Sequence, residues 1–207
     1  MADELVFCTN PMSCGRIVRL MLEDVGQPYR AEILNFTAVK APVHLAVSPM
    51  GKASAIRYGD AVDNECAPVC AYLGDAFLQA GLAPPPGDRA DGPYYRWLLC
   101  AAGPIEAVGA DKALGVVVEH ARRRMVGNGD FGELTDMTEA SACKTDDIAG
   151  AAFTAADVYF GARIRWPLRF GSIQNRPAFK RYWARISERP AAVRARQIDD
   201  AMIAAQA

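Results

Sequence analysis

Three side chains able to take part in chemistry lie close together near the amino terminus of this 207-residue chain: the hydroxyl of Ser13, the thiol of Cys14 and the guanidinium of Arg16. A hydroxyl can donate a hydrogen bond to a bound thiolate, and a cysteine can itself react as the thiolate. At the start of a helix, unpaired N–H groups and the helix dipole favour such an anion. The structural alternative is that Ser13 only caps a helix, Cys14 is a small buried side chain and Arg16 is solvated.

The residues around this cluster predict a strand, a turn and a helix that would position it. Leu5–Thr9 is a mostly apolar run typical of a buried strand, and Asn10–Ser13 indicates a turn. Apolar residues then recur at helical spacing as far as Gly26, a residue type favoured just after a helix end. Ser13 is therefore the expected N-cap, with its hydroxyl bonded to free N–H groups of the first turn.

The remainder of residues 1–80 predicts a small sheet and one more helix. The second strand should pair in parallel with the first, through a right-handed crossover. A weakly helical stretch and the turn Ser48–Gly51 lead to two short strands joined by a hairpin, and Asp63 or Asn64 would cap the helix that follows. These further strands are expected at residues 28–34, 54–57 and 61–62.

Residues 81–92 are rich in Pro, Gly, Asp and Arg and are interpreted as a linker between two domains. Residues 93–207 lack strand-like alternation and predict an all-helical domain. Within it, Thr154 and Asp157 fit a capping box, and Pro167 is expected to end the helix that this box begins. The helices expected in this half span residues 94–108, 110–126, 131–143, 154–166, 177–187 and 190–203.

Composition is that of an ordinary globular protein, with 51% hydrophobic and 23% charged residues, which excludes wholesale disorder. The formal net charge of −1 gives no electrostatic reason to expect nucleic acid or an acidic membrane as partner. The one dense basic run, Arg122–Arg124, is interpreted as solvated surface. The sequence has no signal-peptide pattern and no apolar run long enough to span a bilayer, so we expect a cytoplasmic protein.

The six cysteines are scattered, form no Cys-x-x-Cys motif and are expected to be thiols. His44 and His120 are the only imidazoles, and neither belongs to an acid-and-nucleophile pattern. Both are therefore expected to be structural or surface residues. We expect no metal site.

Four segments, in their order and spacing, resemble motifs of the glutathione S-transferase family, of the bacterial type with Ser or Cys at the first turn. The resemblance covers nearly the whole chain. It implies an α/β thioredoxin-like N-terminal domain followed by an all-α C-terminal domain. The four segments are Asn10–Ser13 followed by Val18-Arg19, Ser48–Lys52, Asn64–Cys66 with Tyr72-Leu73, and Phe153–Asp157.

The resemblance implies that glutathione is the co-substrate and that a hydroxyl of the first turn holds its sulfur as the thiolate. Ser13 is our candidate for this hydroxyl. No tyrosine lies in the first strand or turn, so the tyrosine-using branches of the family fit poorly. The thiolate would add to a small apolar electrophile held in a pocket lined by both domains. For most of the candidate wall residues, the alternative of ordinary core packing is the expectation. These candidates are Tyr94, Tyr95, Trp97, Trp166 and Phe170.

Other residues of the glutathione site are implied by the same resemblance. Lys52 and Ala53 would meet the middle of the tripeptide, Ala53 through its backbone. Glu65 and Cys66 would hold the γ-glutamyl amine and carboxylate, with Cys66 contributing mainly a backbone N–H at a helix start. Lys40 is a candidate partner for the glycine carboxylate, with solvated surface as the alternative for both lysines.

The sequence departs from the family pattern at three positions. Ser54 stands where the family has a cis-proline, and because a cis bond before a non-proline residue costs about 2.5–4 kcal/mol, the Ala53–Ser54 bond is predicted to be trans. Cys66 replaces the usual serine, and a thiol is a weaker donor than a hydroxyl. Met12 occupies a position at which some branches have their catalytic serine or cysteine.

Two other readings remain open. Cys14 would form a mixed disulfide with glutathione if the chain is a glutathione-dependent thiol transferase. Alternatively, the fold serves as a non-catalytic binding or dimer module whose site was degraded by the change at Ser54. The resemblance also implies a homodimer and a role in detoxification.

Overall fold

The computed structural model describes residues 3–170 and 173–205, and the chain divides into two compact units. The first unit is Met1–Ala83 together with Glu188–Ala207, and the second is Pro84–Ser187. These units differ from the expected division into 1–80, a linker at 81–92 and 93–207 in two respects. Residues 84–92 of the expected linker belong to the second unit. The last helix, which sequence pattern alone assigns to the helical half, packs with the first unit.

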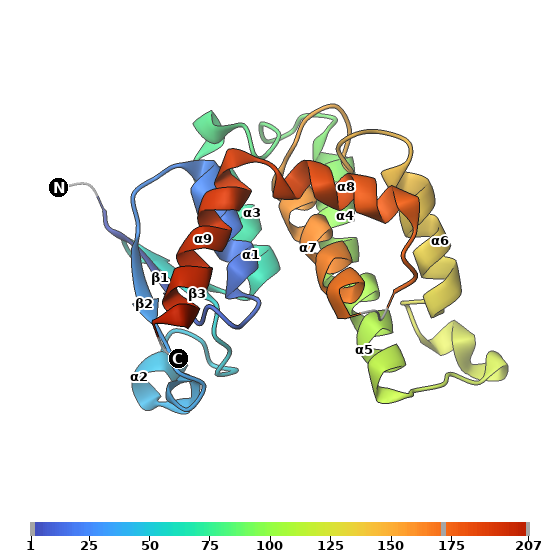
Figure 1. Cartoon of the computed structure of the whole chain (residues 1–207), viewed down its shortest axis with the longest axis horizontal. Helices are drawn as coiled ribbons and strands as arrows, with labels where there is room; N and C mark the ends of the chain where they lie inside the picture. The colour runs from blue at the N-terminus through green and yellow to red at the C-terminus, as the bar shows by residue number, and fades with distance from the viewer. Residues whose placement is uncertain (1–2, 171–172, 206–207) are drawn as a thin grey trace. The chain divides into compact units, whose positions relative to one another are not determined.

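The first unit is built on a four-stranded sheet with the order β2-β1-β3-β4 (Figure 1). Strand β1 is buried along its whole length, pairs in parallel with β2 as predicted, and pairs antiparallel with β3. Strands β3 and β4 form the expected hairpin. The strands span Leu5–Thr9 (β1), Arg30–Ile33 (β2), Ala55–Tyr58 (β3) and Ala61–Asn64 (β4).

Helix α1 (Gly15–Val25) packs against α3 (Cys66–Ala76), which also contacts β3 and β4. Gly26 ends α1 with a φ of 73°, a left-handed conformation that glycine adopts without a Cβ penalty, as predicted. Gly15 allows α1 to approach the end of β1, because a Cβ at this position would overlap the hydroxyl of Thr9.

The segment between β2 and β3 holds two short helices rather than a long one. They are η1 (Ala38–Lys40) and α2 (Pro42–Leu45), and the short η2 (Leu78–Ala80) follows α3. No cis peptide bond occurs in residues 3–170 or 173–205, so the Ala53–Ser54 bond is trans, as predicted.

Helix α9 (Pro190–Ala204) lies along α1 (Figure 1). Ion pairs join the two helices. Arg19 of α1 and Asp199 of α9 are each 1% exposed, and Arg19 Nε lies 2.6 Å from a carboxylate oxygen of Asp199. Nearer the helix ends, Arg194 pairs with Glu23 at 3.0 Å. These charges explain why α9 belongs to the first unit.

The named elements in the described residues of the second unit are all helices, as predicted, but two of them differ from the expected ones. A continuous helical run includes Pro104, because one wider π-helical turn accommodates a residue without an N–H. This run ends at Gly115, whose φ is 70°, so the helix expected at residues 110–126 is wrong. The run consists of α4 (Asp91–Cys100), η3 (Ala101–Ile105) and α5 (Glu106–Leu114).

Pro167 does not end the helix in which it lies, contrary to expectation. Helix α7 (Ala155–Phe170) continues through it and packs against α4 and α8, and this packing outweighs the local cost of proline. The other helices of this unit are η4 (His120–Met125), α6 (Phe131–Ala142) and α8 (Pro177–Ser187), of which α6 and α8 match the expected helices.

The reciprocal half of the capping box at Thr154 and Asp157 is confirmed, but the Thr154 hydroxyl donates to the Asp157 carboxylate at 3.3 Å, and the Asp157 N–H donates to the Thr154 backbone carbonyl. The carboxylate of Asp157 accepts the backbone N–H of Thr154 at 2.9 Å, and also that of Ile148 at 2.7 Å. The hydroxyl of Tyr182 in α8 donates to the same carboxylate at 2.5 Å. Asp157 therefore joins the start of α7 to the preceding loop and to α8.

Candidate active site

The turn that follows β1 is held by a residue that sequence analysis treated only as part of a motif. Asn10 is buried, and its side chain donates to the carbonyl of Leu34 at 2.7 Å and accepts from the N–H of Met12 at 2.8 Å. Its backbone carbonyl accepts the N–H of Ser13 at 3.0 Å. The preference of asparagine for such turns is the signal that could have identified this role.

The hydroxyl of Ser13 is engaged within this turn. It donates to the carbonyl of Asn10 at 2.7 Å and accepts from the N–H of Gly15 at 3.0 Å. The second bond is the capping interaction predicted for Ser13, although the helix begins one residue later than expected and Cys14 is its N-cap. Ser13 is half-buried.

Cys14 is exposed at the start of α1, contrary to the alternative of a buried side chain. Hydrogen bonds within the described chain use the N–H groups of Ser13, Gly15, Arg16 and Ile17, and none of them uses the N–H of Cys14. This amide is therefore available to an anion at the amino end of an eleven-residue helix.

The start of α3 lies against the start of α1. The thiol of Cys66, the first residue of α3, donates to the backbone carbonyl of Cys14 at 3.4 Å. Two helix amino ends therefore meet at one place in the first unit. Sequence analysis placed each residue in the site but could not show this contact.

Glu65 precedes α3 in a strained conformation. Its φ is 67°, and it is the one non-glycine residue with positive φ in the described ranges. Such a conformation costs about 1–3 kcal/mol and recurs at functional sites. The expected cap by Asp63 or Asn64 is wrong, because Glu65 is the N-cap and Asp63 accepts the N–H of Asn64 at 2.8 Å. The Glu65 side chain is exposed.

The loop before β3 is fixed by two buried side chains and presents Lys52 and Ala53. His44 Nε2 lies 2.6 Å from the carbonyl of Lys52, which requires the ring proton on Nε2, and Ser48 Oγ accepts the N–H of Lys52 at 3.3 Å. His44 is thus structural, as predicted. In the described structure, the N–H and C=O of Ala53 have no partner, as a site for an extended peptide requires.

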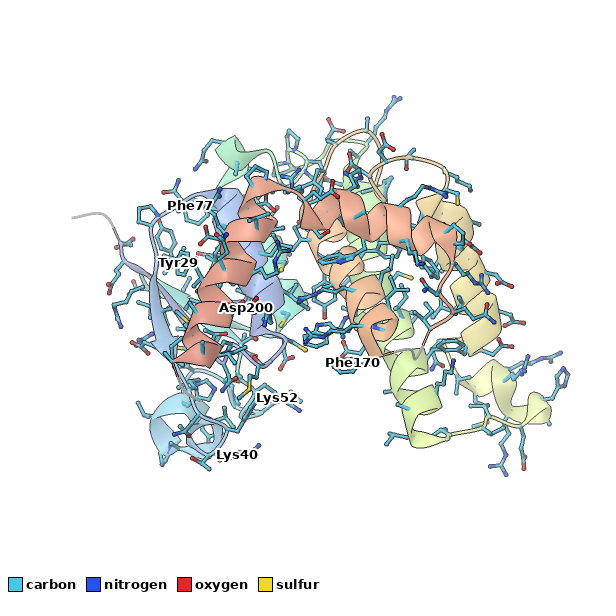
Figure 2. All side chains as sticks on the ribbon, viewed as in Figure 1. Tyr29, Lys40, Lys52, Phe77, Phe170 and Asp200 are labelled. Atoms are coloured by element: carbon cyan, nitrogen blue, oxygen red, sulfur yellow. The ribbon has the colours of Figure 1, made fainter. Side chains whose placement is uncertain are left out.

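Lys40 and Lys52 both lie at the end of the first unit that carries α2 (Figure 2). Both side chains are exposed. The ammonium of Lys40 donates to the carbonyl of Met50 at 2.9 Å and packs over Gly51. Lys40 therefore stabilises this loop, a role that neither alternative from the sequence included.

Arg16, the cation of the cluster near the amino terminus, is turned toward α9. Its guanidinium lies 2.7 Å from Asp200, which is labelled in Figure 2, and 3.7 Å from Asp199. Only 8% of the Arg16 side chain is exposed. Arg16 is therefore a positioning residue for α1, and neither solvated nor available as the cation of the site.

The aromatic residues proposed for an electrophile pocket lie in three different environments in the second unit. Tyr94 and Trp97 are buried core residues, and Trp97 packs edge-on against Phe160 at 5.4 Å. Trp166 and Phe170 stack at 5.5 Å and line a cavity of about 450 Å³. Tyr95 is 40% exposed and contacts the ring of Tyr94. The cavity lies between α5, α6 and α7.

All six cysteines are free thiols, as predicted, but their environments differ. Burial and the neighbouring Glu32 carboxylate raise the pKa of Cys8 to about 11. Burial raises the pKa of Cys70 well above its ordinary value and also raises that of Cys100. The exposed thiols are Cys14 and Cys143.

The described residues contain no group of three or more His, Cys, Asp or Glu side chains arranged to hold a metal ion. None of the helices in those residues is long and apolar enough to cross a membrane.

The chain resembles known proteins in structure but not detectably in sequence. No family model matches it, and no curated protein matches it. A glutathione transferase from Methylococcus capsulatus is 21% identical, with 95% of this chain and 98% of that chain covered and a TM-score of 0.78. A glutathione S-transferase from Xylella fastidiosa is 20% identical, with 95% of this chain and 99% of that chain covered and a TM-score of 0.79. A sphingomonad glutathione S-transferase complexed with glutathione is 20% identical, with 94% of this chain and 98% of that chain covered and a TM-score of 0.77.

These observations define a two-part architecture, with a thioredoxin-like α/β unit that includes the last helix of the chain and an all-helical unit at Pro84–Ser187. The predicted fold class is confirmed. The fold is that of the glutathione transferases.

Proposed function

We propose that the first unit binds glutathione and that the protein transfers it, as the thiolate, to a small apolar electrophile. The observation that carries this proposal is the meeting of two helix amino ends, with Cys66 Sγ 3.4 Å from the carbonyl of Cys14. Such a place favours anionic groups, and glutathione has two carboxylates and an ionisable thiol. The structures of three similar proteins contain bound glutathione or oxidised glutathione, which adds support.

In this proposal, the γ-glutamyl end of glutathione lies at the start of α3. Glu65 accepts from its ammonium group, and the backbone at Cys66 donates to its carboxylate. Ala53 pairs with the middle of the tripeptide through its unpartnered N–H and C=O, and Lys52 lies beside it. Lys40 binds the glycine carboxylate only if its ammonium group gives up its hydrogen bond to the carbonyl of Met50.

Ser13 stabilises the sulfur in the leading form of the mechanism. An ordinary thiol has a pKa near 8.5, and each unit by which this falls needs about 1.4 kcal/mol of preferential stabilisation of the thiolate. The Ser13 hydroxyl must turn away from the Asn10 carbonyl to donate to sulfur. A neutral hydrogen bond contributes about 0.5–1.5 kcal/mol and one to a charged group about 1.5–3 kcal/mol, so this exchange is favourable. The thiolate then forms a C–S bond with the electrophile.

Thiol transfer by Cys14 is a second candidate, which a different observation favours. The Cys14 thiol is exposed at the N-cap of α1, whereas the Ser13 proton is already bonded. Cys14 would attack the disulfide of a glutathionylated substrate and take up the glutathionyl group, releasing the substrate as a thiol.

Apolar electrophiles suit the second unit, whose cavity is lined mostly by apolar side chains including Trp166 and Phe170. Within the proposal, Trp166 remains the candidate for electrophile recognition, and Tyr95 is a candidate through its exposed ring. The core positions of Tyr94 and Trp97 favour a structural role for both.

Calorimetric titration with glutathione tests the proposal as a whole. Millimolar or tighter binding, weakened by Glu65→Gln, is the expected result. No heat of binding at millimolar glutathione would overturn both enzymatic forms and leave the non-catalytic module.

Two substitutions separate the enzymatic forms. Ser13→Ala should abolish conjugation of an aryl halide and spare thiol transfer, and Cys14→Ser should do the reverse. Cys143→Ser, at an exposed thiol of the second unit, is the matched control. The proposed homodimer is tested separately by sedimentation equilibrium.

A further inference from the structure

The Cys66 thiol touches the backbone of another cysteine. Its sulfur lies 3.4 Å from the carbonyl oxygen of Cys14, and the Cys14 side chain branches from the Cα bonded to that carbonyl carbon. The two side chains therefore leave the chain at neighbouring points, although 52 positions separate them in the sequence. Each lies at the start of a helix, Cys14 as N-cap of α1 and Cys66 as the first residue of α3. Disulfide exchange needs two cysteine side chains within reach of each other, and this contact brings them together.

The other four cysteines are poorly placed to react with Cys14. Cys8 lies within β1, and its raised pKa of about 11 keeps it protonated at neutral pH. Cys70 is fully buried one helical turn beyond Cys66, and burial also raises its pKa. Cys100 and Cys143 belong to the second unit. Cys66 is thus the cysteine of the first unit that combines a contact with Cys14 and a position at a helix end.

We propose that Cys14 and Cys66 form a two-cysteine exchange site in which Cys66 resolves a mixed disulfide between Cys14 and glutathione. This inference rests on the thiol-transfer form of the proposed function. The Cys14 thiolate attacks the glutathionyl sulfur of a glutathione disulfide, forming the mixed disulfide and releasing one thiolate. The Cys66 thiolate then attacks Cys14 Sγ, and glutathione leaves as its thiolate.

The product is a disulfide between Cys14 and Cys66, and the electrons balance at each step. The incoming disulfide is reduced to two thiols, and the two cysteine thiols are oxidised to one disulfide and lose two protons. Two molecules of reduced glutathione restore the dithiol by the reverse exchanges. The oxidised protein would have the amino ends of α1 and α3 covalently joined, at the place where the glutathione sulfur is proposed to bind.

Mass analysis after exposure to glutathione disulfide tests the exchange. Wild-type protein is incubated with this disulfide, quenched with an alkylating agent and digested. We expect a peptide containing Cys14 linked to one containing Cys66, and little retained glutathione. Cys66→Ser should accumulate glutathionylated Cys14 with a lifetime at least about tenfold longer than in wild type, because the resolving thiol is absent. Cys70→Ser, the control one turn along the same helix, should behave as wild type.

The pairing itself is tested without glutathione, by oxidising wild-type protein with a diazene dicarboxamide that converts neighbouring thiols to disulfides. A link between Cys14 and Cys66 supports the inference, and its absence overturns it. Stable glutathionylation of Cys14 in wild type, with no such link, would also overturn it and leave the proposed thiol transfer intact. Conversely, a link formed by the oxidant in a protein that glutathione disulfide does not modify would keep the pairing and refute thiol transfer.

Discussion

Removing the carboxylate of Asp199 is expected to destabilise the first unit strongly, because Arg19 would remain buried without its charged partner. Arg19 and Asp199 are each 1% exposed, and their 2.6 Å contact joins α1 to α9. Arg19 keeps weaker partners in this variant. Its Nη1 lies 3.0 Å from the hydroxyl oxygen of Tyr29, and its guanidinium carbon lies 5.4 Å from the centre of the Phe7 ring. These do not neutralise its charge.

Breaking a buried ion pair from one side costs about 3–5 kcal/mol. Because Arg19 retains these partners, we expect Asp199→Ala to lower the free energy of unfolding by about 3 kcal/mol, the lower end of that range. Asp200→Asn is the matched control, since it removes the exposed partner of Arg16 and should cost less than about 1 kcal/mol. Burial raises the pKa of Asp199 despite Arg19 and Arg16, so desolvation offsets much of the attraction. The double variant Arg19→Met with Asp199→Leu should therefore lose less than Asp199→Ala alone.

Urea unfolding followed by circular dichroism and by tryptophan emission measures this effect. All three tryptophans, Trp97, Trp166 and Trp183, lie in the second unit, so emission reports that unit and dichroism reports both. We expect Asp199→Ala to shift the dichroism transition to lower urea. Equal effects of Asp199→Ala and Asp200→Asn would refute the reasoning, and so would a double variant less stable than the single one.

Three further predictions concern single groups. Burial raises the pKa of Tyr29 to about 12 from an ordinary value near 10, so the stability that its protonated form contributes is complete below about pH 10 and lost toward pH 12. Thermal midpoints across this range should fall less steeply in Tyr29→Phe. Asp157→Ala removes a buried carboxylate that accepts four hydrogen bonds and should lower the tryptophan-monitored stability by about 3 kcal/mol or more, a larger loss than that from Asp130→Ala at the N-cap of α6. Gly15→Ala should destabilise by about 1–3 kcal/mol through overlap with Thr9, and adding Thr9→Ala should recover part of that loss in urea titrations.

Sequence patterns predicted correctly the elements whose signals lie within a single short segment. The apolar run of β1, the spacing in α1 with Gly26 after it, and the proline that opens α8 gave correct bounds within one or two residues. Sequence patterns gave wrong helix bounds where tertiary packing outweighed a local preference. Pro167, which was expected to end a helix, lies within α7, because the packing of that helix supports it.

The place of α9 could not be read from the sequence. Its pattern predicts a helix correctly, but 180 positions separate Arg19 from Asp199, and nothing in either segment indicates its partner. A charged residue on a helix is ordinarily interpreted as solvated, and that reasoning left Arg16 as a free cation. Complementary charges on two amphipathic helices become visible only when the helices are placed together.

Residue types located the candidate site, but hydrogen bonding decides how its two reactive side chains differ. Ser13 and Cys14 are adjacent, and the sequence offered no reason to rank them beyond resemblance. In the structure, the Ser13 proton is bonded to Asn10, whereas Cys14 is exposed, has an available amide and contacts the thiol of Cys66 through its carbonyl. In the proposed function, conjugation would therefore require the Ser13 hydrogen bond to rearrange, whereas thiol exchange by Cys14 would not. If Ser13→Ala binds glutathione as tightly as wild type while losing conjugation, that rearrangement occurs after binding, as the sulfur becomes charged.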